Sequence, residues 1–156
     1  MQRRFLQPLA LAIAIVAGTT GCTLGAEVAT MKQYDPSDGV SANVGELALR
    51  NILLISNEQG EANLVMTVVN NSGSTISLNV QYDTGATRLT SALSIPGTPP
   101  RTRFGDIPAD GIIVSASEME TGGLFPVYFE YGDAPGELVF VPVLNGALSE
   151  YELLVP

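Results

Sequence analysis

Apolar residues beyond about residue 34 come in short runs separated by turn-forming residues, and no run keeps a helical period of any length. This pattern is typical of many short β-strands. The alternation is clearest where Ile76, Leu78 and Val80 would face a core while the polar residues between them would face water. The stretch between the fourth and fifth runs carries four prolines and is predicted to be mostly loop. The runs predict eight strands, over residues 47–55, 63–69, 76–81, 88–93, 112–115, 127–131, 137–143 and 151–155.

Strands of this number and spacing predict an all-β fold, an immunoglobulin-like antiparallel β-sandwich of about eight strands formed by residues 34–156. The chain has no tryptophan and a single cysteine, so it lacks the buried tryptophan and the disulfide of antibody domains. A unit of this length is expected to be one domain.

The N-terminal segment has the order of a secretory signal peptide. Arg3 and Arg4 precede an apolar stretch at residues 9–17, and small residues lead to Gly21 and Cys22. The apolar stretch is too short to span a bilayer, which takes about 20 residues. Gly21–Cys22 resembles the lipobox of bacterial lipoproteins, in which the cysteine thiol receives a diacylglycerol group before cleavage. That motif usually has leucine three residues before the cysteine, where this chain has Thr19.

We therefore expect residues 1–21 to be a cleaved lipoprotein signal peptide, residues 22–33 a lipidated flexible tether, and residues 34–156 the folded domain. Cys22 is the lipidation site, and its lipid is the expected contact with the membrane. The predicted location is the outer face of a bacterial cytoplasmic membrane, in the cell envelope. The alternative is an ordinary signal peptide followed by an unmodified cysteine.

The negative net charge of the chain argues against nucleic acid as a partner. All 16 acidic residues follow Gly21, while removal of Arg3 and Arg4 lowers the basic residues from 7 to 5, which gives the mature chain a formal charge of −11. Such a surface repels phosphate backbones, so nucleic acid is not an expected partner. It also repels anionic headgroups, which leaves the lipid as the only expected membrane attachment.

Histidine is absent from the chain, which removes the commonest general base and all histidine-based nucleophile pairs and metal sites. Two carboxylate pairs could act as acid and base: Glu118 with Glu120, and Glu130 with Asp133. Both pairs lie where exposed strand ends and loops commonly carry acids, so the solvated-surface interpretation is favoured. An enzyme is not expected, and neither a cofactor nor a metal site is predicted.

Three weaker site candidates remain. Residues 34–39 place two aspartates before a glycine, as a calcium loop does, but they lack its further oxygen ligands and are expected to form an Asx-type turn. Arg101 and Arg103 form the only basic cluster after the cut and could receive an anionic group, although the solvated-loop interpretation is favoured. Met119 is an expected loop thioether and Met66 an expected core residue.

Three segments resemble known families of the bacterial envelope. Residues 64–73, LVMTVVNNSG, resemble the strand and turn that open the PCu(A)C periplasmic copper chaperones, and residues 125–131 with 136–143 resemble their last two strands. The layout, including residues 34–39 and 50–54, resembles the actinobacterial LpqE-type lipoproteins. The resemblance implies the sandwich fold and the envelope location. The chaperones hold copper with paired histidine and methionine, and Met119, near the second such pair, has no histidine beside it.

The leading functional hypothesis is a lipid-anchored envelope lipoprotein with a non-catalytic binding or scaffolding sandwich. Its partner would be an envelope protein or a cell-wall component, held by loops or by an exposed sheet edge. Two alternatives stay open at this point. One is a copper chaperone-like metal-handling protein that has lost its histidine ligands, and the other is an enzyme that modifies an envelope polymer with a carboxylate pair.

Overall fold

A computed structural model describes residues 34–107 and 111–156. The predicted signal peptide and tether, with Cys22 and Met31, lie outside these residues. Within them, no helix is long and apolar enough to cross a membrane. The elements are β1 (Val40–Val44), β2 (Leu47–Ser56), β3 (Glu61–Asn70), β4 (Ile76–Asp83), β5 (Arg88–Ile95), β6 (Arg101–Phe104), β7 (Ile112–Ser115), β8 (Leu124–Glu130), β9 (Glu137–Asn145) and the 3-10 helix η3 (Glu152–Leu154).

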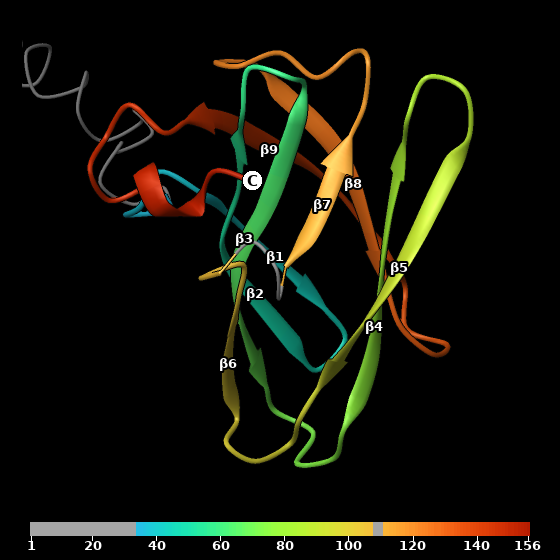
Figure 1. Ribbon diagram of the computed structural model, residues 1–156. Coiled ribbons are helices and arrows are strands. Elements are labelled where there is room, and N and C mark those ends of the chain that lie inside the picture. The colour runs from blue at the N-terminus through green and yellow to red at the C-terminus, as the bar shows by residue number, and fades with distance from the viewer. Residues whose placement is uncertain (1–33, 108–110) are drawn as a thin grey trace, which may run out of the picture. The chain divides into compact units, whose positions relative to one another are not determined.

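The strands form two layers, as Figure 1 shows, and the predicted β-sandwich is confirmed. One layer contains β1, β2, β3, β6 and β7, and the other contains β5, β4, β8 and β9 in that order. Every pairing within a layer is antiparallel. One pairing joins the layers: β9 runs parallel to β2 from Leu54 opposite Val143 to Ser56 opposite Asn145. The sequence pattern did not indicate this parallel seam.

Seven of the eight predicted strands are confirmed as β2, β3, β4, β5, β7, β8 and β9. The eighth, over residues 151–155, is wrong, because this segment forms η3. Both edges of the neighbouring strand β2 are already occupied, one by β3 and the other by β1 and β9 in turn, so no edge remains there for a further strand. Two strands were missed, namely β1 and the short β6 within the proline-rich stretch.

Alternation explains the main core between the layers. In β4 the side chains of Leu78, Val80 and Tyr82 are buried, whereas Ser77 and Asp83 are exposed, as predicted for a strand with one wet face. The inner faces of the other strands add aliphatic side chains and two phenylalanines, Phe125 and Phe129, to the same cluster. Met66 is fully buried in this core, as expected.

The second half of β2 is buried on both faces, which accounts for its uninterrupted apolar run. Its inner side chains join the main core, while Leu53 and Ile55 point outward. A second, smaller cluster covers them: Val65 of β3 and, from the C-terminal segment, Tyr151, Leu154 and Val155. The C-terminal segment therefore stabilises the outer face of β2 and β3 by packing across it.

Asn70, buried at the end of β3, holds three segments together with its side-chain amide. Its Nδ2 donates to the carbonyl oxygens of Ser74 at 2.8 Å and of Ile95 and Pro96 at 3.3 Å each. Its Oδ1 accepts from the backbone N–H of Ser72 at 3.0 Å and from the Ser72 hydroxyl at 2.7 Å. One side chain thus fixes the β3–β4 turn against the end of β5, and a buried amide needs such partners.

We predict that Asn70→Ala lowers the free energy of unfolding by about 2–3 kcal/mol, because it removes the amide donor from the buried carbonyl group of Ile95 and from the half-buried ones of Ser74 and Pro96. Urea unfolding followed by circular dichroism measures this change. The matched control is Asn79→Ala on the outer face of β4, which we expect to change stability by about 0.5 kcal/mol or less. Equal losses for the two variants would contradict the role given to Asn70.

Candidate binding surfaces

The outer face of β8 and β9 carries a continuous row of apolar side chains. Three cross-strand pairs form it, in which Leu124 lies opposite Pro142, Pro126 opposite Phe140, and Tyr128 opposite Leu138. We call these six residues the apolar ladder. Leu124, Leu138 and Phe140 are 64%, 54% and 56% exposed, although inward-facing neighbours in the same strands are buried. An exposed apolar patch of this kind on a strand pair is typical of an interaction surface.

Polar groups border the apolar ladder on the side of β4 and β5. Gln81 of β4, opposite Tyr128, donates from its amide Nε2 to Oε1 of Glu130 at 2.5 Å. Farther along the same strands, Asp83 lies opposite Arg88. A shallow hollow of about 270 Å³ is lined by Gln81, Asp83 and Arg88 together with three ladder residues, Pro126, Tyr128 and Leu138. An apolar centre with a polar margin is the usual composition of a protein–protein interface.

Arg101 and Arg103, predicted as loop residues that could receive an anion, lie on β6 instead. Both side chains are exposed and, being two residues apart, point to the same outer face. Register adds a third cation that the sequence did not reveal, because Arg50 of β2 lies opposite Thr67 of β3, and Thr67 lies opposite Arg103. We call Arg50, Arg101 and Arg103 the arginine face. The Cα atoms of Arg50 and Arg103 are about 10 Å apart, since two strand spacings separate them.

Local contacts hold two of these arginines. The guanidinium Nη1 of Arg50 donates to the carbonyl oxygens of Ala42, at 2.9 Å, and Leu49, at 2.7 Å. Arg103 pairs with Asp106 through an Nη2–Oδ1 distance of 2.8 Å, while both side chains stay about half exposed to solvent. An exposed pair of this kind contributes little to stability. The arginine face is therefore ordered on its strands yet remains open to a ligand.

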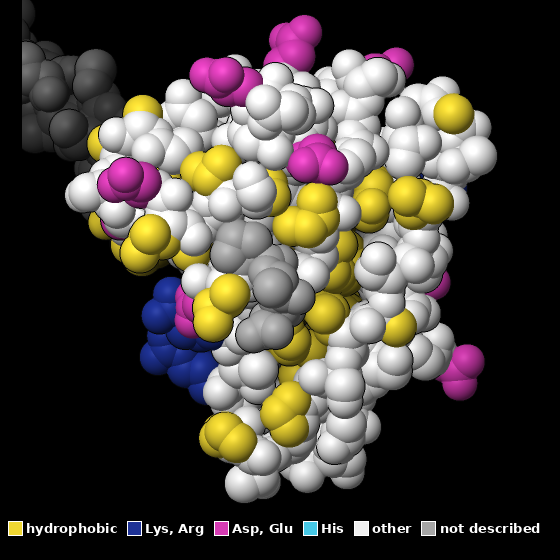
Figure 2. Space-filling model, viewed as in Figure 1, with side chains coloured by type: hydrophobic (Ala, Val, Ile, Leu, Met, Phe, Trp, Pro, Cys, Tyr) yellow, Lys and Arg dark blue, Asp and Glu magenta, His cyan; other side chains and the backbone are white. Residues whose placement is uncertain are grey.

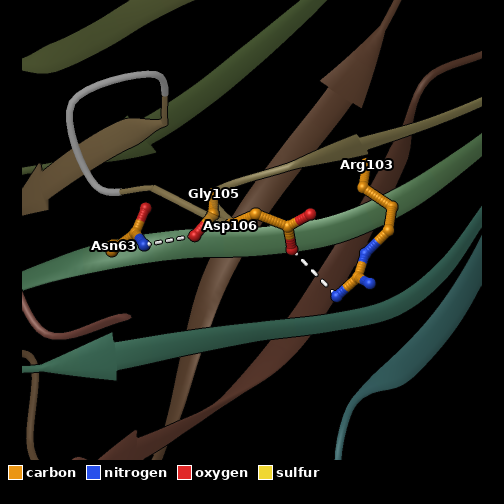
Figure 3. A network of polar contacts seen from close by, with 4 residues as sticks. All are labelled: Asn63, Arg103, Gly105 and Asp106. Atoms are coloured by element: carbon orange, nitrogen blue, oxygen red, sulfur yellow. Dashed lines mark hydrogen bonds and ion pairs between the residues drawn. The ribbon is translucent and has the colours of Figure 1, made fainter. Parts of the chain in front are cut away.

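A hydrogen bond from the side chain of Asn63 holds the turn after β6 in place (Figure 3). Nδ2 of this buried side chain donates to the carbonyl oxygen of Gly105 at 2.8 Å and to that of Leu154 at 3.0 Å. Gly105 has a φ of +79°, and a Cβ there would lie 2.4 Å from the carbonyl oxygen of Leu64, so only glycine fits. This turn places Asp106 where it meets Arg103 (Figure 3).

Met119, a candidate interaction residue, lies between β7 and β8 and is half-buried against the main core. A hollow of about 600 Å³ lies beside it and is also lined by Glu58, Glu61 and Ser117. Copper(I) prefers several soft thioether or imidazole ligands. Within the described ranges, no group of three or more histidine, cysteine, aspartate or glutamate residues could hold a metal ion. One thioether with surface carboxylates does not fit a copper site.

The carboxylates proposed as catalytic pairs lie on exposed loops and at the end of a strand. Glu118 and Glu120 are exposed on either side of Met119, Asp133 is exposed in the β8–β9 turn, and Glu130 accepts the hydrogen bond from Gln81 described above. Paired catalytic carboxylates act from the two sides of a bound substrate. Neither of the two hollows described above is lined by both members of either pair.

The aspartates of residues 34–39 are occupied by structural contacts. Asp35 accepts from the backbone N–H of Ser41 at 2.9 Å, and Asp38 accepts from the Tyr151 hydroxyl. That hydrogen bond to Asp38, followed by burial and the negative charges of Asp38 and Glu150, raises the pKa of Tyr151 to about 12. Asp35 therefore links the segment before β1 to that strand, and Asp38 links the same segment to the C-terminal segment. Both carboxylates serve in structural contacts and not in a calcium site.

Comparisons with known proteins bear on the fold. No family model matches the chain, and no curated protein matches it. Among solved structures, the apo PmoF2 PCuAC domain is similar with a TM-score of 0.50 and 19% identity, over 70% of this chain and 98% of that one. The copper-bound PCuAC domain from PmoF2 gives a TM-score of 0.47 and 19% identity, over 68% and 97%. The chain thus has a PCuAC-like fold, while the LpqE-type assignment stays a prediction.

Proposed function

We propose that this chain is a lipid-anchored cell-envelope protein whose β-sandwich is a non-catalytic module that binds an envelope protein through the apolar ladder. The ladder is the observation that carries the proposal. Four of its six apolar residues stay exposed and the other two are half-buried, although the domain has a large core in which to bury such side chains. Large exposed apolar patches are uncommon on monomeric proteins and mark interaction sites.

The chemistry of the apolar ladder favours a protein partner over a cell-wall polysaccharide. Tyr128 brings the only side-chain hydrogen-bonding group among its six residues, whereas sugar hydroxyls need several donors and acceptors. Aromatic side chains such as Tyr128 and Phe140 are enriched in protein interfaces, where they bury a large area at small entropic cost. A non-catalytic role agrees with the absence of histidine and with the scattered carboxylates.

The anchor is supported by sequence alone, from the signal-like N-terminus and the single cysteine. We predict that the mature N-terminal peptide, isolated from membranes and measured by mass spectrometry, begins at Cys22 and carries diacylglycerol on its thiol. A Cys22→Ser variant should keep its signal peptide or leave the membrane fraction. Recovery of an unmodified Cys22, or of a protein that retains Met1, would remove the anchor from the proposal.

We predict that the lipidated chain retains a specific envelope protein in a pull-down from solubilised membranes. Phe140→Asp should abolish retention, because it places a charge in the centre of the apolar ladder, where a partner would have to desolvate it. Thr90→Asp, which adds the same charge on β5 of the same layer, is the matched control and should retain the partner. Equal capture by both variants would contradict binding through the ladder, and capture of a polysaccharide would replace the protein partner.

Copper handling was the second hypothesis, and the PCuAC-like fold is a reason to test it. We predict that the chain, titrated with Cu(I) against a competing chelator, binds no copper more tightly than micromolar, because the chain has no histidine to pair with Met119. Met119→Leu should leave the titration unchanged. Tight binding that this variant removes would reinstate the metal-handling role.

A further inference from the structure

The charges of the domain are segregated. Of the four arginines in the described residues, three form the arginine face, and in Figure 2 the dark-blue side chains gather at one place. Asp106, which pairs with Arg103, and Asp35, which bonds to the Ser41 amide in the strand next to β2, border them. The C-terminal segment beside them on the same outer face adds Glu150 and Glu152 and bonds Asp38 through Tyr151. The other nine described acidic residues are accompanied by one cation, Arg88. The arginine face therefore holds three of the four described cations.

The chain enters the domain beside the arginine face. Val40 at the start of β1 pairs with Ile52, and the backbone N–H of Gly39 donates to Oδ1 of Asn51 at 3.1 Å, next to Arg50. Residues 22–33, twelve in number, precede the described part. The flexible tether predicted from the sequence at residues 22–33 would have an end-to-end distance of about 20 Å. A lipid on Cys22 would thus hold the arginine face close to the bilayer surface.

We propose that β6 and the adjoining parts of β2 and β3, beside the C-terminal segment, dock through their outer face onto anionic phospholipid headgroups, with Arg50, Arg101 and Arg103 contacting their phosphates. This inference rests on the proposed lipid anchor and adds an orientation to it. Net charge alone predicts repulsion from such a surface, but the segregation of charge makes the repulsion depend on which face is presented. Guanidinium groups also bind phosphate oxygens in bidentate fashion.

Weak contacts are sufficient for such docking, because the lipid already supplies the affinity. Once the chain is anchored, the arginines act at the high effective concentration of a tethered group and need only select one orientation. The outer faces of the two layers of a sandwich point in opposite directions. Docking through the arginine face would therefore leave the apolar ladder, on the outer face of the other layer, turned away from the bilayer and free for its partner.

The test places a probe on each outer face of the full lipidated protein purified from membranes. Cys22 is then blocked by its lipid, so a dye labels only the cysteine introduced by Thr67→Cys, inside the arginine face, or by Thr90→Cys, on the outer face of β5. Nitroxide-labelled headgroups in phosphatidylglycerol-containing vesicles should quench the dye at residue 67 roughly twofold more than at residue 90, because the arginines attract that lipid.

Several controls separate the outcomes. The difference should vanish in phosphatidylcholine vesicles, in about 0.5 M salt and in the double variant R101Q/R103Q, whereas R101K/R103K should keep most of it. Equal quenching at the two positions in anionic vesicles overturns the orientation and leaves the anchor intact. Equal quenching combined with arginine-dependent cosedimentation with a purified phosphodiester wall polymer would reassign the face to that polymer. An unmodified Cys22 overturns the anchor and the orientation together.

Discussion

Burial of β2 is the constraint on which the rest of the structure depends. β3 occupies one edge of β2 along most of its length, while β1 and β9 share the other edge. Its inner side chains enter the main core, and in its second half the outer ones enter the second cluster. The parallel seam with β9 links the two layers at this strand. Removal of β2 would therefore disconnect the layers, the C-terminal segment and the chain entry at β1 together.

The sequence predicted those parts of the fold that local periodicity encodes. Seven strands have runs of apolar residues strong enough to be recognised, and burial alternates along β4, β7, β8 and β9. β1 and β6 were missed because small and charged residues occupy them and because neighbouring strands, more than their own propensity, make them extended. The C-terminal segment is apolar because it packs over Leu53 and Ile55. Its apolar residues therefore reflect a tertiary contact, although in the sequence they resemble a strand.

The candidate surfaces were also predicted from the sequence only in part. Arg101 and Arg103 were predicted as a pair because they are neighbours in sequence, but Arg50 joins them only through the register of three strands. The apolar ladder was missed although its signal was present: residues 138–143 of the predicted hairpin are apolar at every position, which is more than one buried face requires. Met119 was correctly placed between strands, yet it packs against the core, and the chain has no histidine to pair with it.

The entry of the chain through β1 has a mechanical consequence. A force applied between a lipid at Cys22 and a protein held on β9 would be transmitted through β1 into β2 and across the short parallel seam. The first contacts to bear the load would be those of the entering segment, namely Asp35 with Ser41, Asp38 with Tyr151 and Gly39 with Asn51, followed by the β1–β2 ladder. The core between the layers would be loaded last, so tension could peel away the first strand while leaving the remaining sandwich folded.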